Sequence, residues 1–323
     1  MNEFKTYQNG INLGGWLSQC EHTKQHYDTF LTKKDLHWIK EHGYDHVRLP
    51  VDYEVVVTDH GEWKKDGFSY IDRCISWCKE EGLYMILDLH KTKGYTFDEP
   101  KSAYNFFKDP SLTEFFLNIW EENARRYKNE KIIAFELLNE IVPYDVADQW
   151  NRIAEKAIER IRVITKDTYI LVGGVCYNSI STVPLLKIAR RENVVYTFHC
   201  YEPFIFTHQE AEWVDCIPKG IKVKYPESFD EVKTNLAGSI QQLLKERNIN
   251  EFGKEFFEAL FEQAVNYAKE QKVPLYCGEY GVICYADELS KKRWFQDIEE
   301  VFGKYKIGHA SWNYKSLMFG LHD

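Results

Sequence analysis

Two glutamates stand out because each interrupts an otherwise apolar segment of the sequence. Glu140 ends the segment KIIAFELLNE (131–140), and Glu279 lies in PLYCGEYG (274–281). Burying a carboxylate costs several kcal/mol unless its charge is paired, so an apolar segment rarely carries one without a reason. Two carboxyl groups flanking one bond suit glycoside hydrolysis, in which one donates a proton to the leaving oxygen and the other attacks or activates water.

Further polar or aromatic residues end the other apolar segments or lie next to the two glutamates. They are Arg48, His90, Asn139, His199, Tyr201 and Trp312. A salt bridge to a neighbour such as Arg48 would explain one glutamate, but it explains the whole set much less well. His90, His199 and Glu140 are metal-ligand types, but no H-E-x-x-H or H-x-H spacing supports a metal. We therefore expect neither a metal nor another cofactor.

Eight short apolar segments, alternating with helical patterns, must position these residues. Apolar side chains nearly throughout such a segment indicate a parallel strand buried on both faces. The segments span 10–15, 45–50, 83–90, 131–140, 168–175, 193–201, 274–281 and 308–314, and the helical patterns lie near 32–42, 68–82, 112–128, 146–164, 182–191, 255–271 and 287–305. Cap-like residues open several helices, namely Thr32, Ser69, Ser111 and Thr182. Together they predict an α/β (β/α)₈ TIM barrel, with the active site at the carboxyl ends of the strands.

Two features depart from a regular barrel. About fifty residues separate strand six from its helix, so we expect an inserted subdomain over 205–254, with its own helix in 233–247, within a single catalytic domain spanning 1–323. Only about ten residues follow strand eight, too few for a closing helix. We therefore expect the eighth helix to be missing, as in a truncated chain, and the groove between the first and seventh helices to be open or filled by something else.

Composition and charge exclude several classes of function. The net charge is −9 and no basic block stands out, which argues against nucleic-acid or anionic-membrane binding. No apolar stretch is long enough for a transmembrane helix, and the N-terminus lacks a signal-peptide pattern. The 8 cysteines contain no C-x-x-C pair and weakly favour a reducing compartment. The protein would be secreted if a signal or parent polypeptide was trimmed, and cytoplasmic otherwise; we expect a monomer.

The sequence resembles glycoside hydrolase family 5, which belongs to a clan of retaining barrel glycosidases with glutamates at the ends of strands four and seven. The resemblance covers essentially the whole chain, and it looks closest to the clostridial endoglucanase type with a subdomain inserted after strand six. It is carried in chain order by the motifs HVRLP (46–50), LDLH (87–90), FELLNE (135–140), FHCYEPF (198–204), YCGEYG (276–281) and ASWNY (310–314).

The resemblance implies a role for each matched residue. Glu279 would be the nucleophile and Glu140 the acid and then the base, with their carboxyl groups about 5 Å apart and net retention. The remaining roles concern the nucleophile and the sugar. Arg48 and Tyr201 would hydrogen-bond Glu279, Asn139 would contact the sugar 2-hydroxyl, His199 would lie beside Glu140, His90 would bind the −1 sugar, and Trp312 would form the floor beneath it.

The resemblance implies a retaining endo-β-1,4-glucanase whose partner is a β-glucan polysaccharide or oligosaccharide, of cellulose type or mixed linkage. A β-mannanase or xyloglucan-active enzyme, exo action, and a non-catalytic carbohydrate-binding barrel stay open as alternatives. Aromatic residues make up 15% of the chain, and their rings pack well on pyranose faces. We expect Trp16 and Trp213, and further rings such as Tyr95, to form subsites. The segment HKTKGY (90–95) departs from the relatives' pattern and leaves the glucan preference open.

Overall fold

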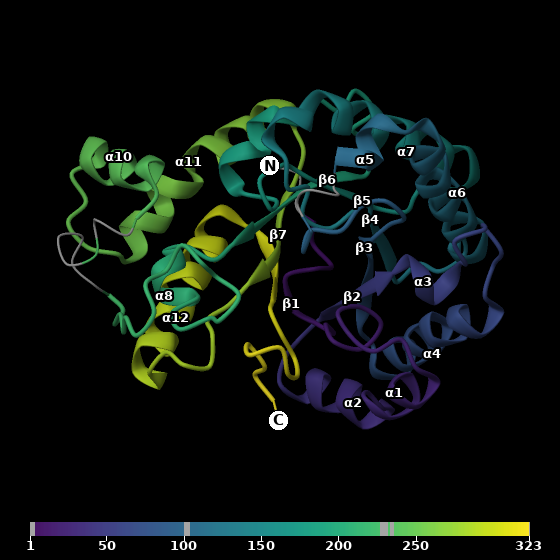
Figure 1. The fold of residues 1–323 in the computed structure, drawn as a ribbon, viewed down its shortest axis with the longest axis horizontal. Coiled ribbons are helices and arrows are strands. Elements are labelled where there is room, and N and C mark those ends of the chain that lie inside the picture. Colours follow the sequence, from purple (N-terminus) through teal and green to yellow (C-terminus); the bar gives the residue numbers. More distant parts are fainter. Residues whose placement is uncertain (1–3, 100–103, 227–231, 233–235, 323) are drawn as a thin grey trace.

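The computed structural model describes residues 4–99, 104–226, 232 and 236–322. Eight parallel strands pair in chain order, and β8 pairs with β1, so the sheet closes into a barrel (Figure 1). The strands are β1 Asn9–Asn12, β2 His46–Asp52, β3 Tyr84–Lys91, β4 Ile133–Glu136, β5 Ile170–Gly173, β6 Val194–Cys200, β7 Leu275–Tyr280 and β8 Gly308–Ser311. All eight predicted strands are confirmed, and with them the TIM barrel. Most are shorter than their apolar segments.

Helices surround the strands, and most of them match the predicted patterns. They are α1 Lys24–Thr29, α2 Lys33–Glu41, α3 Tyr53–Val56, α4 Lys65–Glu81, α5 Tyr104–Lys108, α6 Pro110–Tyr127, α7 Ala147–Ile164, α8 Phe204–Thr207, α10 Gly238–Arg247, α11 Lys254–Gln271 and α12 Glu288–Tyr305, with 3₁₀ turns at η1 Tyr144–Val146 and η2 Ile180–Leu185. In the part of the chain that is described, no helix is both long and apolar enough to cross a membrane.

The predicted helix at 182–191 and three of the predicted caps are wrong. That segment forms the short 3₁₀ turn η2, which contains Pro184 and Thr182, because proline lacks the N–H that a continuing helix needs. Ser69 lies inside α4, and Ser111 lies in the first turn of α6. Thr32 is confirmed as the N-cap of α2, where its side chain and Asp35 form a capping box.

The interior of the barrel changes from apolar to charged along β3. Successive residues of a strand face opposite sides, so alternate residues of β3 point into the barrel. Ile86 belongs to a buried cluster inside the barrel with Ala134, Val195 and Tyr276, whereas its neighbours Met85 and Leu87 belong to the cluster between the sheet and the helices. The same alternation places Asp88 and His90 above Ile86, toward the carboxyl end of the barrel.

The long connection between β6 and α11 contains α8 and α10. Figure 1 shows α10 at the outer side of α11, away from the barrel strands. Residues 227–231 and 233–235 of the predicted insertion 205–254, and the beginning of its predicted helix, lie outside the described residues. We keep 205–254 as a proposed boundary.

No helix follows β8 in residues 312–322, as the sequence predicts. Instead this C-terminal segment packs against α2. The Tyr314 hydroxyl donates to Asp35 at 3.0 Å, and the His322 ring stacks on Trp38 with 4.7 Å between ring centroids. The segment therefore lies beside α2 (Figure 1).

Candidate active site

Glu279 lies near the carboxyl end of β7 and accepts hydrogen bonds from the buried Arg48 and the partly buried Tyr201. The Arg48 Nη1 atom lies 2.8 Å from Oε1 of Glu279, and the Tyr201 hydroxyl donates to Oε2 at 2.9 Å. Burial, reinforced by the charge of Glu279, raises the pKa of Tyr201, so its hydroxyl remains a donor. Both expected contacts to Glu279 are present, and they fix the direction of its carboxylate.

Glu140 lies four residues beyond the end of β4 and faces the same point. The Nδ1 atom of His199 lies 2.8 Å from Oε1 of Glu140 and 3.5 Å from Oε2 of Glu279. His199 and Glu279 are direct neighbours in the pairing of β6 with β7. A carboxylate oxygen of Glu140 and one of Glu279 lie within 4.8 Å of each other. Carboxyl groups this close suit a retaining glycosidase better than an inverting one, whose pair must leave room for a water.

The surroundings of Glu140 and His199 shift the pKa of each side chain away from its ordinary value. Burial, followed by the nearby charge of Glu279, raises the pKa of Glu140 well above its usual value. Burial, followed by the charge of Arg48, lowers the pKa of His199 well below its usual value. A carboxyl that holds its proton beside a neutral imidazole is suited to act as a general acid.

A buried charge network lies beneath these residues. The Arg48 guanidinium is fully buried and contacts three carboxylates, at 2.7 Å from Glu136, 2.8 Å from Glu279 and 3.1 Å from Asp88. Its Nη2 atom also donates to Oδ1 of Asn139 at 3.0 Å. Arg48 therefore links Glu279 on β7 to β3, β4 and the segment that carries Glu140.

Glu136 is a member of this network that was not among the residues expected from the sequence. Glu136 accepts both Nε and Nη2 of Arg48, at 2.7 and 3.1 Å, in a two-pronged contact. Two features of the sequence could have indicated it. Glu136 is a third glutamate inside an apolar run, FELL, and the neighbouring strand β3 carries Asp88 at the position that pairs with Glu136. Burial raises the pKa of Glu136 to about 7.

His90, Asn139 and Trp312 line the cleft together with the two glutamates. The His90 Nδ1 atom is 2.7 Å from Asp88, whereas its buried Nε2 atom has no hydrogen-bond partner among the described residues. Burial alone would lower the pKa of His90, but the charge and hydrogen bond of Asp88 outweigh it and raise the pKa. Trp312 stacks parallel to the His90 ring, with centroids 5.9 Å apart. The unpaired Nε2 and the flat ring together suit a sugar.

The cleft is large and continues beyond Glu140 and Glu279. Its volume is about 1630 Å³, and residues of α10 and α11 line it as well as the strand ends. Trp213 lies on this cleft with 58% of its surface exposed, which suits its expected role. Trp16 does not suit it: the ring is fully buried, stacks on Trp77 and donates Nε1–H to the carbonyl of Tyr27 at 2.9 Å. The expectation that Trp16 contacts substrate is therefore wrong.

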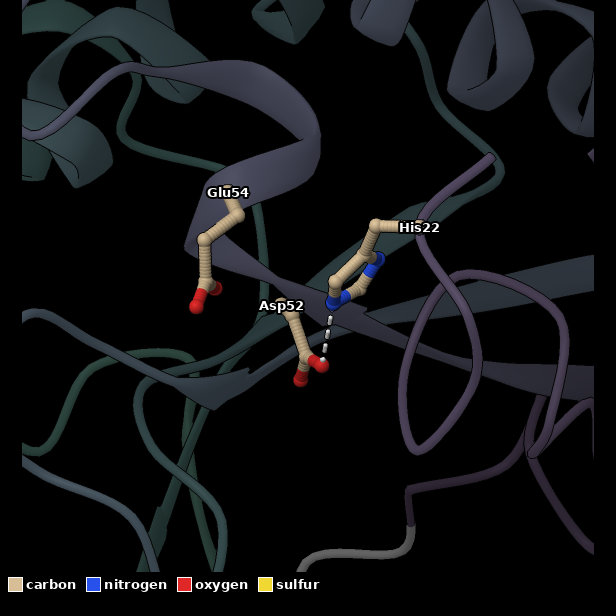
Figure 2. A group of neighbouring side chains, drawn as sticks. All are labelled: His22, Asp52 and Glu54. Atoms are coloured by element: carbon tan, nitrogen blue, oxygen red, sulfur yellow. Dashed lines mark hydrogen bonds and ion pairs between the residues drawn. The ribbon is translucent and has the colours of Figure 1, made fainter. Parts of the chain in front are cut away.

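Among the described residues, two side-chain groups have the composition of a metal site. Figure 2 shows His22 facing Asp52, with the Glu54 carboxylate beside them. However, His22 is bonded through both ring nitrogens, to Tyr27 at 2.6 Å and to Asp52 at 3.1 Å, and the Lys91 ammonium lies 2.6 Å from Glu54. In the second group, Glu140, His199 and Glu279, the close atoms already contact one another. We assign a metal to neither group.

Comparisons with known proteins show the family of this chain. The profile of the family described as Cellulase (glycosyl hydrolase family 5) matches residues 5–317. The chain is 40% identical to Endoglucanase C of Acetivibrio thermocellus, across 98% of this chain and 94% of that protein. It is 38% identical to Cellodextrinase A of Ruminococcus flavefaciens, across 92% and 82%. A solved structure of Thermotoga maritima Cel5A in complex with cellobiose superposes with a TM-score of 0.78 at 27% identity, across 99% and 93%.

Proposed function

This chain belongs to glycosyl hydrolase family 5, the cellulase family, and we propose that it is a retaining endo-β-1,4-glucanase with Glu140 and Glu279 as its catalytic pair. The observation that carries the mechanism is the spacing of the pair, whose carboxylate oxygens come within 4.8 Å. At this distance Glu279 can reach the anomeric carbon while Glu140 reaches the oxygen that leaves it, and no room remains for a water held between a base and the sugar.

In the first step, Glu279 attacks the anomeric carbon and forms an ester bond to the sugar. The bond from that carbon to the leaving oxygen breaks, and Glu140 gives its proton to this oxygen. The raised pKa of Glu140 supports this assignment, because the acid must still hold its proton when the substrate arrives. Arg48 and Tyr201 hold the Glu279 carboxylate toward the carbon that it attacks.

In the second step, Glu140 acts as the base. It takes a proton from water as the water attacks the anomeric carbon, and the Glu279 carboxylate leaves, so the β configuration is restored. The sugar contacts follow the cleft: Asn139 reads the 2-hydroxyl, His90 donates its free Nε2–H to the −1 sugar, and Trp312 packs beneath that ring. His199 keeps the Glu140 carboxyl in place from the side.

The substrate is a β-glucan, of cellulose type or mixed linkage. The named relatives support this class, since they are an endoglucanase, a cellodextrinase and a barrel solved with cellobiose. Initial rates and product lengths on carboxymethyl cellulose, lichenan, laminarin, glucomannan and xyloglucan rank the alternatives. Fastest hydrolysis of glucomannan would favour a β-mannanase, and fastest hydrolysis of xyloglucan would favour a xyloglucan-active enzyme.

We expect the protein to be a monomer, which light scattering can test.

Substitution of each glutamate tests the catalytic pair. We expect Glu140→Gln and Glu279→Gln each to lower turnover of β-glucan by about 10³-fold or more, with the fold intact by circular dichroism. Glu122→Gln is the matched control, because Glu122 lies on α6 and pairs with Arg126 on the outer surface. Near-wild-type hydrolysis by either variant of the pair would refute the assignment.

A further inference from the structure

Tyr95 was expected to be a ring of the substrate cleft, but its position is different. Only 2% of its surface is exposed, and its ring packs against Phe106 and Phe107. It follows β3 in a tight turn, in which the backbones of Thr92 and Tyr95 bond each other at 3.2 and 2.9 Å. Gly94 makes this turn possible, since its φ is +77°.

The Tyr95 hydroxyl holds the backbone of Glu140. It donates a hydrogen bond to the carbonyl of Glu140 and accepts one from the N–H of Val142 at 2.9 Å. Burial raises the pKa of this hydroxyl, so it keeps the proton that it donates. One side chain thus bridges the peptide groups on both sides of Ile141.

The backbone that Tyr95 holds is strained. Glu140 has a φ of +28°, a backbone conformation that residues other than glycine rarely adopt. It persists only where the surrounding structure imposes it. Neighbouring contacts help: the Asn139 N–H donates to Leu89 at 3.0 Å, and the Tyr177 N–H donates to Ile141 at 3.1 Å. These two bonds fix the residues on either side, and the Tyr95 hydroxyl fixes the carbonyl of Glu140 itself.

We propose that Tyr95 is a positioning residue for the general acid, Glu140. The Tyr95 hydroxyl holds the strained backbone of Glu140 so that the Glu140 carboxyl reaches the leaving oxygen. The inference rests on the proposed function and deepens it. Because Tyr95 is buried behind Glu140, it acts through Glu140 and touches no substrate. Its loss should therefore damage the two proton transfers of the reaction and leave the attack by Glu279 unchanged.

Substrates that differ in their need for an acid separate this role from a general structural one. For Tyr95→Phe we expect kcat/KM for cellotetraose to fall about 10- to 100-fold. For 2,4-dinitrophenyl β-cellobioside, whose leaving group departs without a proton, we expect kcat/KM to change less than about threefold. Tyr127→Phe is the matched control, because it removes a buried hydroxyl that bonds Asp72 on the outer helices. It should change neither value.

Two further measurements test that Tyr95 acts through Glu140. Azide attacks the glycosyl-enzyme without a base, so it should raise kcat of Tyr95→Phe on the dinitrophenyl substrate and leave kcat of Tyr127→Phe unchanged. In a double-mutant cycle on cellotetraose, Tyr95→Phe should cost almost nothing further once Glu140→Ala is present. Full independent losses in the cycle would overturn the proposal.

Other outcomes also have a definite meaning. An equal loss of kcat/KM on both substrates in Tyr95→Phe would show a structural role and overturn the proposal, as would full activity on cellotetraose. Failure of the proposed function is seen separately: the wild-type protein would not cleave cellotetraose at all, or Glu140→Gln would cleave it normally. If Tyr95→Phe is poorly folded, Gly94→Ala displaces the same turn while keeping the hydroxyl, and the same difference between the two substrates is expected.

Discussion

Replacing Glu136 by glutamine tests whether Glu136 is protonated or ionised in the buried network around Arg48. One guanidinium faces three carboxylates there, Asp88, Glu136 and Glu279, so the network holds an excess of acidic groups. Burial raises the pKa of Glu136 to about 7, and this effect outweighs the attraction of Arg48. Glu136 should therefore keep its proton in the folded protein under conditions where the unfolded chain has lost it.

The pKa shift sets the size of the expected effect. A pKa of about 7 in the folded state, against an ordinary value of 4.5, corresponds to about 3 kcal/mol of folding free energy. Because the folded-state pKa is the higher one, this stability is fully present below pH 4.5 and is lost as the pH rises through about 7. Glutamine does not titrate. The free energy of unfolding of Glu136→Gln, taken relative to the wild type, should therefore rise by about 3 kcal/mol between about pH 4 and pH 8.

Urea denaturation of both proteins at several pH values across this range measures the difference. Glu80→Gln is the control, because Glu80 is exposed and the hydrogen bond from Lys33 lowers its pKa, so its trend should have the opposite sign. A pH-independent difference for Glu136→Gln would refute the reasoning. So would a difference that falls as the pH rises, because Glu136 would then be an ordinary ionised partner of Arg48.

Three further predictions follow from the site and its support. Glu279→Gln should lower the pKa of Glu140, because the Glu279 charge adds to burial in raising it; a ¹³C NMR titration of the Glu140 carboxyl that shows no change would contradict this. Trp16→Ala should lower the free energy of unfolding by about 3–5 kcal/mol, whereas Trp213→Ala should raise KM for cello-oligosaccharides about three- to tenfold at unchanged Tm; the opposite pattern would reverse their places. Gly94→Ala should lower the free energy of unfolding by at least about 1 kcal/mol, since its φ is positive and a Cβ would lie 2.4 Å from Leu112; an unchanged urea midpoint would show that the turn tolerates a side chain.

The strands and the meeting of Glu140 and Glu279 could be predicted because their signals are local. A strand buried on both faces leaves an apolar run, and a glutamate or a histidine at its end is visible as an exception. The helix expected at 182–191 does not form, because Pro184 lies inside the segment and keeps the turn short.

The remaining misses depend on distances between segments far apart in the chain. A tryptophan after strand one can face the cleft or the outer helices, and only the stacking of Trp16 on Trp77 decides between them. In the sequence, Glu136 is not distinguishable from other charged residues. Its role becomes visible only from the two hydrogen bonds that Arg48 donates to it. The sequence favours a sugar-binding ring at Tyr95, whereas the structure shows its hydroxyl donating a hydrogen bond to the backbone carbonyl of Glu140.

The most direct test of the mechanism traps the covalent intermediate. A 2-deoxy-2-fluoro β-cellobioside with a dinitrophenyl leaving group slows both steps, so the glycosyl-enzyme accumulates and its position can be read by peptide mass spectrometry. The mechanism predicts one fluorocellobiosyl group per chain, attached to Glu279, with Glu140 unmodified. Label on Glu140, or inversion of the anomeric configuration in the product of the natural substrate, would contradict it.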